Sequence, residues 1–526
     1  MLLSLLLLIP LIIMAVHLPI YSDELLYKWF SGRYWLDNGI TLGLFPHCSD
    51  QFTQRTPKLF LVTRLIDSWL YAELNNPLKI RYLGIFSFLL WLTLMFFVCR
   101  RLFADQFSRQ FGLCVALVFL GTLPLMMTLN RPEQSLILAL TGLSLLPLAK
   151  NPTRLTRITL TLLFAFLTTW FFPQHPKTLL FLPFFSAVCF FLPLSSFARL
   201  SLGAWMIVMA YSSYSFYSKY HSCPANENIE QLFSATLISP SMFLKMPWFY
   251  TKQLIRNVFS IPRYFSAIIF SSTTEADWLP PAKTTIITTI LNCFINLFLG
   301  GWCIGAILGC LKQVRKNKFS LTTDYRSSSS ILLLAGICAM AVLQTTKSFY
   351  NSTLVFPAII LAGTLGNQDI GITFFPERIR RVLNYSTVAL SFISFLFLGS
   401  LYLPTNLSEW KKGGRIERQY FSFSGFNWKS IENRIKQLES KCGLANTPST
   451  KHLLVDDITY PFFIRTREPY HANYLTGYWA VGIENLGSFL RERKSDGLIC
   501  QCKFLPPDLL SKVYREGDFC CLPAFK

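Results

Sequence analysis

The chain has 526 residues, of which 52% are hydrophobic and only 15% are charged, and its mean hydropathy is +0.39. Soluble domains carry roughly 25% charged residues, so this composition argues against a wholly soluble protein. The 48 Phe and 12 Trp exclude a disordered chain. The formal charge of +21 is explained by the Lys/Arg excess that membrane proteins keep on cytoplasmic loops, so no nucleic-acid partner is inferred.

Apolar runs predict an α-helical polytopic membrane protein with about eleven transmembrane helices, since one crossing takes roughly 20 apolar residues. The first run, MLLSLLLLIPLIIMAVHLPI, lacks a basic n-region and an A-x-A cleavage site, which favours a retained helix over a cleaved signal. The runs lie at 1–20, 83–99, 111–129, 135–149, 158–172, 178–194, 200–217, 285–311, 331–346, 353–366 and 382–403.

The distribution of Lys and Arg predicts the orientation in the membrane. If the N-terminus is cytoplasmic, every even-numbered connection is positively charged. These connections carry Arg100, Arg101, Arg109, Lys150, Arg154, Arg157, Arg199, Lys312, Arg315, Lys316, Lys318, Arg326, Arg378, Arg380 and Arg381. The sequence therefore predicts a multi-pass protein of the inner (plasma) membrane, with loops 21–82 and 218–284 and the tail 404–526 on the outer, periplasmic side.

The tail has the composition of a small soluble α/β domain. HLLVDD (452–457) and GLICQCKF (497–504) are typical of strands, and IENLGSFLRERK (483–494) is typical of a helix. In loop 218–284, residues 244–265 mix aromatic, basic and aliphatic side chains, as in a helix lying at the membrane interface. We therefore predict two domains, residues 1–403 in the membrane and 404–526 outside it.

Seven of the 14 cysteines fall on the predicted outer side, where an oxidising environment allows disulfides. Because seven is odd, one of them must stay free or pair elsewhere. Cys500-Gln-Cys502 and the adjacent Cys520-Cys521 lack zinc-finger spacing, so a metal site is not favoured there. The outer-side cysteines are Cys48, Cys223, Cys442, Cys500, Cys502, Cys520 and Cys521.

Two adjacent carboxylates, Asp23 and Glu24, directly follow the first predicted helix. A carboxylate at the membrane edge is costly unless it has a partner or a function. It can act as a general base toward an acceptor hydroxyl, or it can bind a metal. The alternative is that the pair caps a following helix, Leu25–Asp37.

Three further outer connections carry charged residues. In the short loop 130–134, Glu133 is a second carboxylate and Arg131 could contact phosphate, whereas the plain alternative is a turn with Pro132 and Glu133 starting the next helix. His175 and Lys177 could hold an anionic headgroup or a leaving phosphate, or Lys177 could be a snorkelling interfacial lysine. Lys347, in the last such connection, has the same two interpretations.

The common location of these residues is the main argument for a site. Carboxylates and cations from four outer connections are predicted at one membrane face, and an acid–base site for a lipid-linked phosphorylated donor needs this combination. Asn351-Ser352-Thr353 also fits a glycosylation sequon, but it adjoins a predicted helix.

This layout resembles the GT-C membrane glycosyltransferases, the superfamily of the protein O-mannosyltransferases and the lipid A aminoarabinose transferase. Members have an acidic residue early in a long first outer loop, where Asp23-Glu24 stands, and many have a second carboxylate in the next outer loop, where Glu133 stands. The Arg-Pro-Glu of 131–133 and the late Lys347, Tyr350 and Pro357 also match motifs of members.

The resemblance implies a GT-C-like helix bundle and an inverting glycosyltransferase. The enzyme would move a hexosyl or pentosyl group from a polyprenyl-phosphate donor to an envelope acceptor, a glycolipid, polysaccharide or protein. Asp23 would be the catalytic base with Glu24 beside it, and this pair could also hold a divalent cation, Mg or Mn. The substrate-binding residues would be Arg131, Glu133, His175, Lys177, Lys347 and Tyr350.

The rival hypothesis is a polytopic transporter or lipid flippase for envelope precursors. Transporters place ionisable residues near the bilayer midplane, often on interrupted helices. Here the predicted helix interiors hold almost no charges, which favours chemistry at the interface. A third hypothesis is an assembly or sensor protein whose tail binds envelope partners, and such a protein would not need Asp23 and Glu24.

Overall fold

The structure is a computed structural model of the whole chain. It describes residues 6–17, 24, 57–61, 63, 65–66, 78–149, 151–220, 246–271, 282, 284–316, 324–344, 349–366, 376–411, 416–417, 420–421, 428–444, 452–456, 459–463, 468–471, 495–502, 505, 507 and 509–523. The chain divides into two compact units. The first comprises Met1–Val16, Arg81–Tyr217 and Ser234–Thr405, and the second comprises His17–Ile80, Ser218–Phe233 and Asn406–Lys526.

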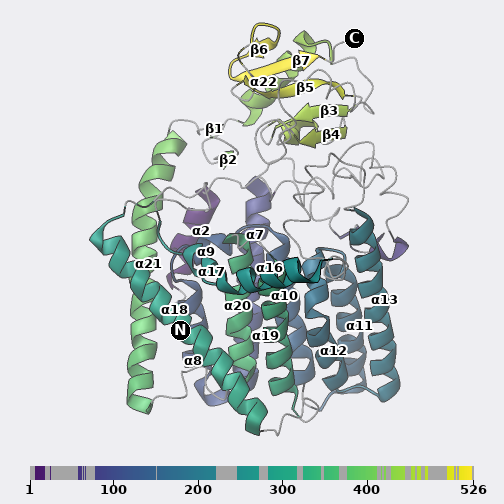
Figure 1. Cartoon of the computed structure of the whole chain (residues 1–526), viewed down its shortest axis with the longest axis vertical. Coiled ribbons are helices and arrows are strands. Elements are labelled where there is room, and N and C mark those ends of the chain that lie inside the picture. The colour runs from purple at the N-terminus through teal and green to yellow at the C-terminus, as the bar shows by residue number, and fades with distance from the viewer. Residues whose placement is uncertain are drawn as a thin grey trace. The chain divides into compact units, whose positions relative to one another are not determined.

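The first unit is a bundle of helices (Figure 1). Its α-helices are α2 (Leu8–His17), α7 (Leu78–Leu102), α8 (Phe107–Val118), α9 (Leu123–Met126), α10 (Pro132–Leu145), α11 (Arg154–Phe171), α12 (Leu182–Phe191), α13 (Ser196–Tyr220), α16 (Pro247–Phe259), α17 (Arg263–Ser266), α18 (Ile286–Lys316), α19 (Tyr325–Leu343), α20 (Phe349–Gly366) and α21 (Glu377–Lys411). The 3₁₀ helices of this unit are η3 (Ala104–Gln106), η4 (Leu146–Leu148) and η5 (Pro176–Phe181), whereas η2 (Lys58–Phe60) belongs to the second unit.

Four helices in the described part of the chain are long and apolar enough to cross a membrane: Ile80–Leu102, Ile286–Lys312, Tyr325–Leu343 and Glu377–Leu403. Two shorter apolar segments, Pro176–Phe191 and Tyr350–Gly366, accompany them. The mostly helical membrane protein expected from the sequence is therefore confirmed. The count of about eleven spans is not confirmed, because many of the predicted runs form helices shorter than a full crossing.

Helix α20 forms the centre of the bundle and packs against α10, α18 and α19. Its described side chains from Asn351 to Gly366 are almost all buried. Most of α20 is apolar on every side, and such a helix is stable only when other helices surround it. This explains why α20 is buried at the centre of the bundle. Its position brings the start of α20, where Tyr350 and Asn351 lie, into the interior of the first unit.

The apolar run at 111–129 forms two helices rather than one. Helix α8 ends at Val118, and Gly121 then adopts a positive φ of 61°, a conformation that glycine adopts without steric cost. The Gly121 amide donates a hydrogen bond to Ser394 Oγ at 2.8 Å, which ties this turn to α21. The chain then passes through α9 and reaches Arg131 with every residue from Phe111 to Thr141 buried.

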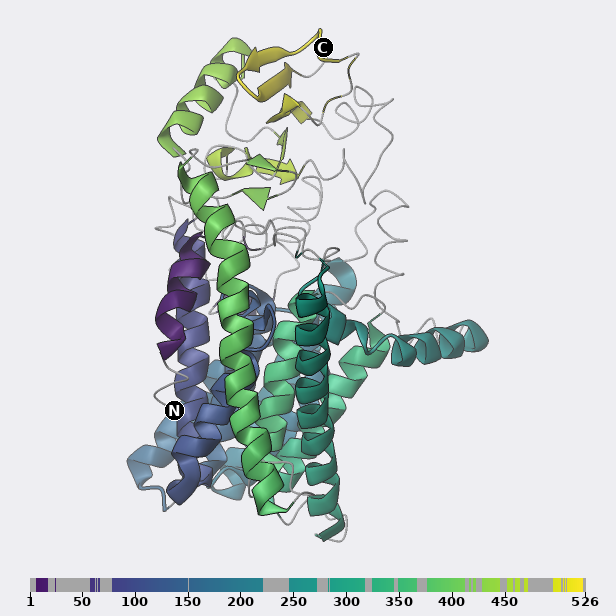
Figure 2. The same cartoon turned by 90° about the vertical axis from the view of Figure 1, so that its left-hand side faces the viewer.

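The amphipathic segment expected at 244–265 contains α16, which lies crosswise to α19 and α20 (Figures 1 and 2). Trp248, Phe249 and Phe259 are exposed, whereas Tyr250 and Asn257 are buried. The Asn257 amide nitrogen donates to the Val342 carbonyl at 2.6 Å and anchors the helix to α19. The expected helix is present, and its location at a membrane surface stays a prediction.

The second unit contains a five-stranded sheet with the order β4-β3-β5-β7-β6. Its strands are β3 (His452–Val455), β4 (Glu468–His471), β5 (Ser495–Gln501), β6 (Tyr514–Glu516) and β7 (Phe519–Pro523), and a short pair, β1 (Ile416–Glu417) and β2 (Tyr420–Phe421), is separate. Strand β3 is parallel to β4 and β5, whereas β7 is antiparallel to β5 and β6. Both strands expected in the tail are therefore present, and the helix expected at 483–494 lies outside the described residues.

Two disulfides hold this sheet together, Cys442–Cys521 and Cys502–Cys520. Successive residues of a strand point to opposite faces, so the adjacent Cys520 and Cys521 bond on opposite sides of the sheet. Cys521 bonds to Cys442, the residue directly after helix α22 (Trp428–Lys441), and Cys520 bonds to Cys502, the residue directly after β5.

Cys500 is the one described outer-side cysteine without a disulfide, which fits the odd count in the sequence, and Cys48 and Cys223 lie outside the described residues. Cys500 stands opposite Cys520 in the antiparallel ladder of β5 and β7. Burial, together with the negative charge of Asp456, raises the pKa of the Cys500 thiol well above its usual range. A thiol that stays protonated is a poor nucleophile, so we expect Cys500 to be unreactive toward the neighbouring Cys502–Cys520 disulfide.

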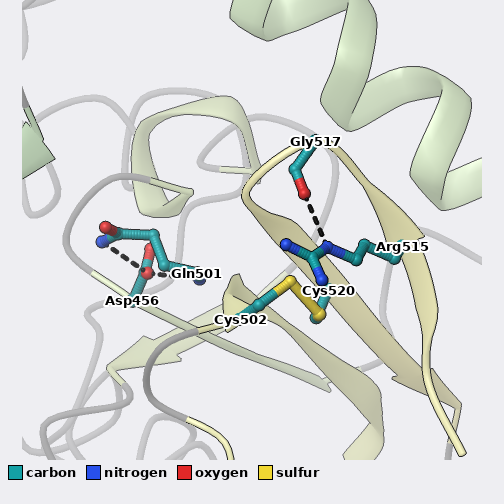
Figure 3. The surroundings of a disulfide bond; sticks show 6 residues. All are labelled: Asp456, Gln501, Cys502, Arg515, Gly517 and Cys520. Atoms are coloured by element: carbon teal, nitrogen blue, oxygen red, sulfur yellow. Dashed lines mark hydrogen bonds between the residues drawn. A yellow bond between two sulfur atoms is a disulfide. The ribbon is translucent and has the colours of Figure 1, made fainter. Parts of the chain in front are cut away.

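Asp456 joins the ends of β3 and β5 next to this disulfide (Figure 3). One carboxylate oxygen accepts from the Thr459 amide at 2.8 Å, and the other accepts from the Gln501 amide at 2.7 Å and from its side chain at 3.0 Å. Both oxygens of this buried carboxylate are thus bonded, which is the condition under which a buried charge is tolerated. Asp456 has the contacts of a structural residue.

Gly84 of α7 permits close contact with the segment that leads to Arg131, and its replacement tests that contact. A Cβ at Gly84 would stand 2.1 Å from the Thr128 carbonyl oxygen and 2.9 Å from the Asn130 amide nitrogen. We expect Gly84→Ala to lower the free energy of unfolding by about 1–3 kcal/mol through overpacking. The matched control is Gly203→Ala in α13, where no atom lies within 4 Å of the new Cβ.

Thermal unfolding of the purified protein in detergent measures both variants. Gly203→Ala should leave stability unchanged or raise it by up to about 1 kcal/mol, because alanine favours helix more than glycine does. Equal unfolding temperatures for the two variants would show that α7 does not contact residues 128–130 as described.

Candidate functional site

The starts of three helical segments meet in the first unit, at α10, η5 and α20. Each segment begins with residues singled out in the sequence: Arg131 and Glu133 at α10, His175 and Lys177 at η5, and Tyr350 at α20. The first amides of a helix lack internal acceptors and give its start a partial positive charge, so helix starts favour anions.

Glu133 lies at the centre of the site and is 1% exposed. One of its carboxylate oxygens forms a salt bridge with the Lys177 ammonium, and the other lies 3.4 Å from Arg131 Nε. From the sequence, the alternative to a site role was a turn in which Pro132 and Glu133 start the next helix. The structure shows that position, because Pro132 and Glu133 are the first two residues of α10. Glu133 can therefore both stabilise the first turn of α10 and hold the two cations.

Lys177 is also bound by α20. Its ammonium donates to Asn351 Oδ1 at 2.5 Å as well as to Glu133, and the residue is only 5% exposed. A lysine held in this way is not a snorkelling lysine, so that alternative is wrong. The ammonium connects η5 with both α10 and α20.

Tyr350 gives the cations an aromatic face. The Arg131 guanidinium carbon lies 4.2 Å from the centre of the Tyr350 ring, and the Lys177 nitrogen lies 5.3 Å from it. Cation–π contacts of this kind hold a cation without neutralising its charge. Arg131 and Lys177 are thus fixed by contacts that leave the cluster of Arg131, Glu133, Lys177, Tyr350 and Asn351, hereafter the Glu133 cluster, with a net charge of +1.

Tyr264 of α17 is a further residue next to the Glu133 cluster. It is 1% exposed, and burial together with the neighbouring phenol of Tyr350 raises the pKa of its own phenol. Its carbonyl oxygen accepts a hydrogen bond from Ser352 Oγ at 3.1 Å. Segment 246–271 therefore contributes a wall beside the start of α20.

His175 has a local role. Its Nδ1 accepts a hydrogen bond from the Lys177 amide at 3.0 Å and so caps η5. This contact fixes the start of η5 and with it the position of the Lys177 side chain. The imidazole also contributes to the positive potential at Glu133.

The pKa of Glu133 shows which way these charges act. Burial alone disfavours the ionised carboxylate, but the positive charges of Lys177, Arg131 and His175 outweigh it and lower the pKa to about 2. Glu133 is therefore ionised at every physiological pH. A carboxylate with so low a pKa is a weak base, so Glu133 is suited to holding cations and not to accepting a proton from a substrate.

The structure places six of the eight residues singled out in the sequence. Arg131, Glu133, His175, Lys177 and Tyr350 come together, and Glu24 is fully buried. Asp23 and Lys347 lie outside the described residues. Among the residues that the structure describes, no three His, Cys, Asp or Glu side chains lie close enough to hold a metal ion.

Sequence reasoning missed Asn351 and Tyr264. Asn351 drew attention only as part of a sequon, yet Asn351, Ser352 and Thr353 are all buried, and the Asn351 side chain binds Lys177. A buried asparagine cannot receive a glycan in the folded protein. The useful signal was a polar Asn-Ser-Thr run at the start of a strongly apolar helix, because buried polar groups require partners.

Comparison with known proteins found no matching family model and no matching curated protein. Among solved structures, ArnT from Cupriavidus metallidurans bound to undecaprenyl phosphate is 13% identical with a TM-score of 0.44, and the match covers 100% of this chain and 97% of that one. The Archaeoglobus fulgidus oligosaccharyltransferase in the apo form is 12% identical with a TM-score of 0.42, over 95% of this chain and 69% of that one. Its complex with Zn and sulfate is 10% identical with a TM-score of 0.43, over 94% and 68%.

The identities are low, so no residue of this chain is assigned a role from those structures. The chemistry of the Glu133 cluster is derived from its own contacts.

Removing the charges of Glu133 and Lys177 one at a time tests the ion pair. We expect Lys177→Met to lower the free energy of unfolding by about 3–5 kcal/mol, because it leaves a buried carboxylate undercompensated. The double variant Glu133→Gln/Lys177→Met should lose less than the sum of the two single variants, since each partner is costly mainly when it is alone.

Chemical denaturation of the four proteins in one detergent measures this cycle. The exposed pair Glu377 and Arg381 is the control, because a solvated pair contributes little, and Arg381→Gln should leave stability unchanged. Additive losses for Glu133 and Lys177 would show that they do not interact.

The low pKa of Glu133 predicts a pH dependence. A lowered pKa stabilises the fold above the unfolded value near 4.3, and this contribution is lost as the pH falls toward 2. A shift from about 4.3 to about 2 corresponds to about 3 kcal/mol. The stability difference between wild type and Glu133→Gln should therefore stay constant from pH 8 to pH 5.5 and shrink below about pH 4.5. A difference that already shrinks between pH 8 and pH 6 would contradict the assignment.

Proposed function

We propose that this protein is a membrane glycosyltransferase that transfers a hexosyl or pentosyl group from a polyprenyl-phosphate donor to an envelope acceptor. The observation that carries the proposal is the convergence of Arg131, Lys177 and Tyr350 on the buried Glu133 at the starts of three helical segments. A net positive cluster at helix starts is suited to a phosphate group. The resemblance of the sequence to GT-C enzymes supports the same conclusion.

In this proposal the cluster binds the donor phosphate. Lys177 and Arg131 offset the negative charge that grows on the phosphate as the sugar leaves, which is the kind of stabilisation that accelerates group transfer most. Lys347, two residues before the start of α20, would add a third cation. His175 acts through the start of η5 by fixing the backbone of Lys177.

Glu133 is a positioning residue in this scheme. Its ion pairs hold Arg131 and Lys177 in place before the donor arrives, so the site does not have to reorganise during the reaction. Because its pKa is low, Glu133 is not proposed as the catalytic base.

Asp23 is proposed as the catalytic base. An acceptor hydroxyl attacks the anomeric carbon as the bond from that carbon to the phosphate oxygen breaks. The hydroxyl proton goes to the Asp23 carboxylate, and the polyprenyl phosphate leaves with the bonding electron pair, so the anomeric configuration inverts. Glu24 would orient Asp23, and a divalent cation, Mg or Mn, is proposed only at this pair.

The proposed cellular setting follows from the same residues. The protein would be a multi-pass inner (plasma) membrane protein with a cytoplasmic N-terminus, and residues 404–526 would be periplasmic. Its partners would be the bilayer, the lipid-linked donor and a glycolipid, polysaccharide or protein acceptor. Segment 218–284, with α16, would admit the lipid carrier.

The transporter or flippase hypothesis is less well supported. A translocation path needs ionisable residues near the middle of the bilayer. The Glu133 cluster instead lies at the starts of α10, η5 and α20, where a reaction at the membrane surface would take place.

Mass spectrometry of envelope glycans and glycolipids tests the function. We expect the deletion strain to lack one hexose- or pentose-sized increment, and we expect complementation with Asp23→Asn at matched expression not to restore it. Glu377→Gln, an exposed carboxylate in the same unit, is the control and should restore it fully.

Kinetics with membranes test the donor site separately. Arg131→Gln should raise the KM for the lipid-linked donor at least about tenfold, which corresponds to losing one charged contact of about 1.4 kcal/mol. Unchanged glycans in the deletion strain would overturn the enzyme assignment. Full activity of Asp23→Asn would overturn only the choice of base.

A further inference from the structure

A shallow groove runs between the first turns of α11 and α13, in the first unit. It is lined by Arg154, Arg157, Ile158, Leu162, Leu194 and Ala198, and its volume is about 270 Å³. Figure 1 shows α11 and α13 side by side along their length, and the Trp205 indole of α13 donates to Thr169 Oγ1 of α11 at 3.0 Å. Two cations thus line a groove that is otherwise mostly apolar, with Thr161 and Ser195 as its other polar residues.

The groove lies at the opposite end of α11 from the Glu133 cluster. Helix α11 runs for 18 residues from Arg154 to Phe171, which corresponds to about 27 Å. The Phe171 carbonyl accepts from Thr178 Oγ1 of η5 at 3.2 Å, so the far end of α11 adjoins the segment that holds Lys177. The groove and the Glu133 cluster therefore lie near opposite ends of α11.

Arg154 and Arg157 are in an electrostatically unfavourable place. Both lie in the first turn of α11, where the helix dipole favours anions over cations. Within the described part of the chain neither guanidinium has a hydrogen bond or an ion pair, and no acidic side chain lines the groove. Arg199 differs, because its guanidinium donates to the Phe190 carbonyl at 2.7 Å and closes the end of α12.

The groove continues into an apolar surface. Ile158 and Leu162 are one helical turn apart on α11, and both are exposed, as are Leu155 and Phe166 of the same helix. Side chains of this kind suit a hydrocarbon chain. The two guanidinium groups next to them suit a phosphate.

We propose that this groove binds one anionic glycerophospholipid of the bilayer. Its phosphate would lie between Arg154 and Arg157, and an acyl chain would run along Ile158, Leu162 and Ala198. The bound anion would relieve the unfavourable placement of two cations at the start of α11. In the orientation expected from the sequence, the lipid belongs to the cytoplasmic leaflet, where anionic lipids attract basic residues. This proposal does not depend on the glycosyltransferase function.

Native mass spectrometry of the detergent-purified full chain tests the proposal, with phosphatidylglycerol and phosphatidylcholine as probes. Wild type should retain one phosphatidylglycerol in preference to phosphatidylcholine. Arg154→Gln/Arg157→Gln should weaken phosphatidylglycerol binding at least about tenfold, because each basic residue near a lipid surface contributes about fivefold. Ala198→Phe, which fills the groove without changing the charge, should weaken it as well.

The matched control is Arg100→Gln/Arg101→Gln at the last turn of α7, which removes the same charge from residues that do not line this groove. This variant should bind phosphatidylglycerol as wild type does. Equal loss in the control and in Arg154→Gln/Arg157→Gln would reduce the effect to general surface charge and overturn the proposal. Equal retention of both lipids by wild type would also overturn it, and unchanged unfolding temperatures confirm that the variants are folded.

Discussion

The contact between Glu133 and Lys177 is the constraint on which the first unit depends. It joins α10 to η5, and Asn351 extends it to α20, so that three separate parts of the chain meet at one buried carboxylate. Buried charges are costly, and the cost is tolerable only when each has a partner in good geometry. The chain meets this condition because Arg131, Lys177 and Asn351 partner one another through Glu133 and the Lys177 ammonium, and the cap that His175 provides to η5 holds the Lys177 backbone.

In the proposed mechanism, the Glu133 cluster binds phosphate and a different group accepts the proton. Cations that already hold a carboxylate keep its pKa low, so the same group cannot serve as a base near neutral pH. For this reason the proposal assigns the role of base to Asp23 and not to Glu133. The two ends of the bundle also differ in a way that electrostatics explains. Arg131, at the start of α10, has Glu133 as its partner, whereas Arg154 and Arg157, at the start of α11, have none among the described residues and are suited to an external anion.

Much of the architecture could be predicted from local patterns. Apolar runs located most of the helices, and the short apolar stretches in HLLVDD and GLICQCKF located β3 and β5, because buried elements need apolar side chains. The count of about eleven spans was not confirmed, since apolarity alone does not distinguish a full crossing from shorter packed helices such as α10 and α12. The break between α8 and α9 depends on one glycine and on the close approach of α21, and a run of apolar letters does not reveal such contacts. The disulfide pairs could not be predicted either, because they depend on which faces of β5 and β7 meet.

The sequence by itself determined that the protein is a mostly helical membrane protein. It also identified the candidate residues and predicted that they share one end of the helices, because composition, charge asymmetry and helix-start chemistry are local properties. Only the tertiary structure decided which candidates meet. It brought Arg131, Glu133, Lys177 and Tyr350 into contact, added Asn351, and gave Glu133 the pKa of a structural anion. The partners of Lys177 are Glu133, which is 44 positions away in the sequence, and Asn351, which is 174 positions away. No spacing rule predicts such partners, since they are fixed by the packing of whole helices.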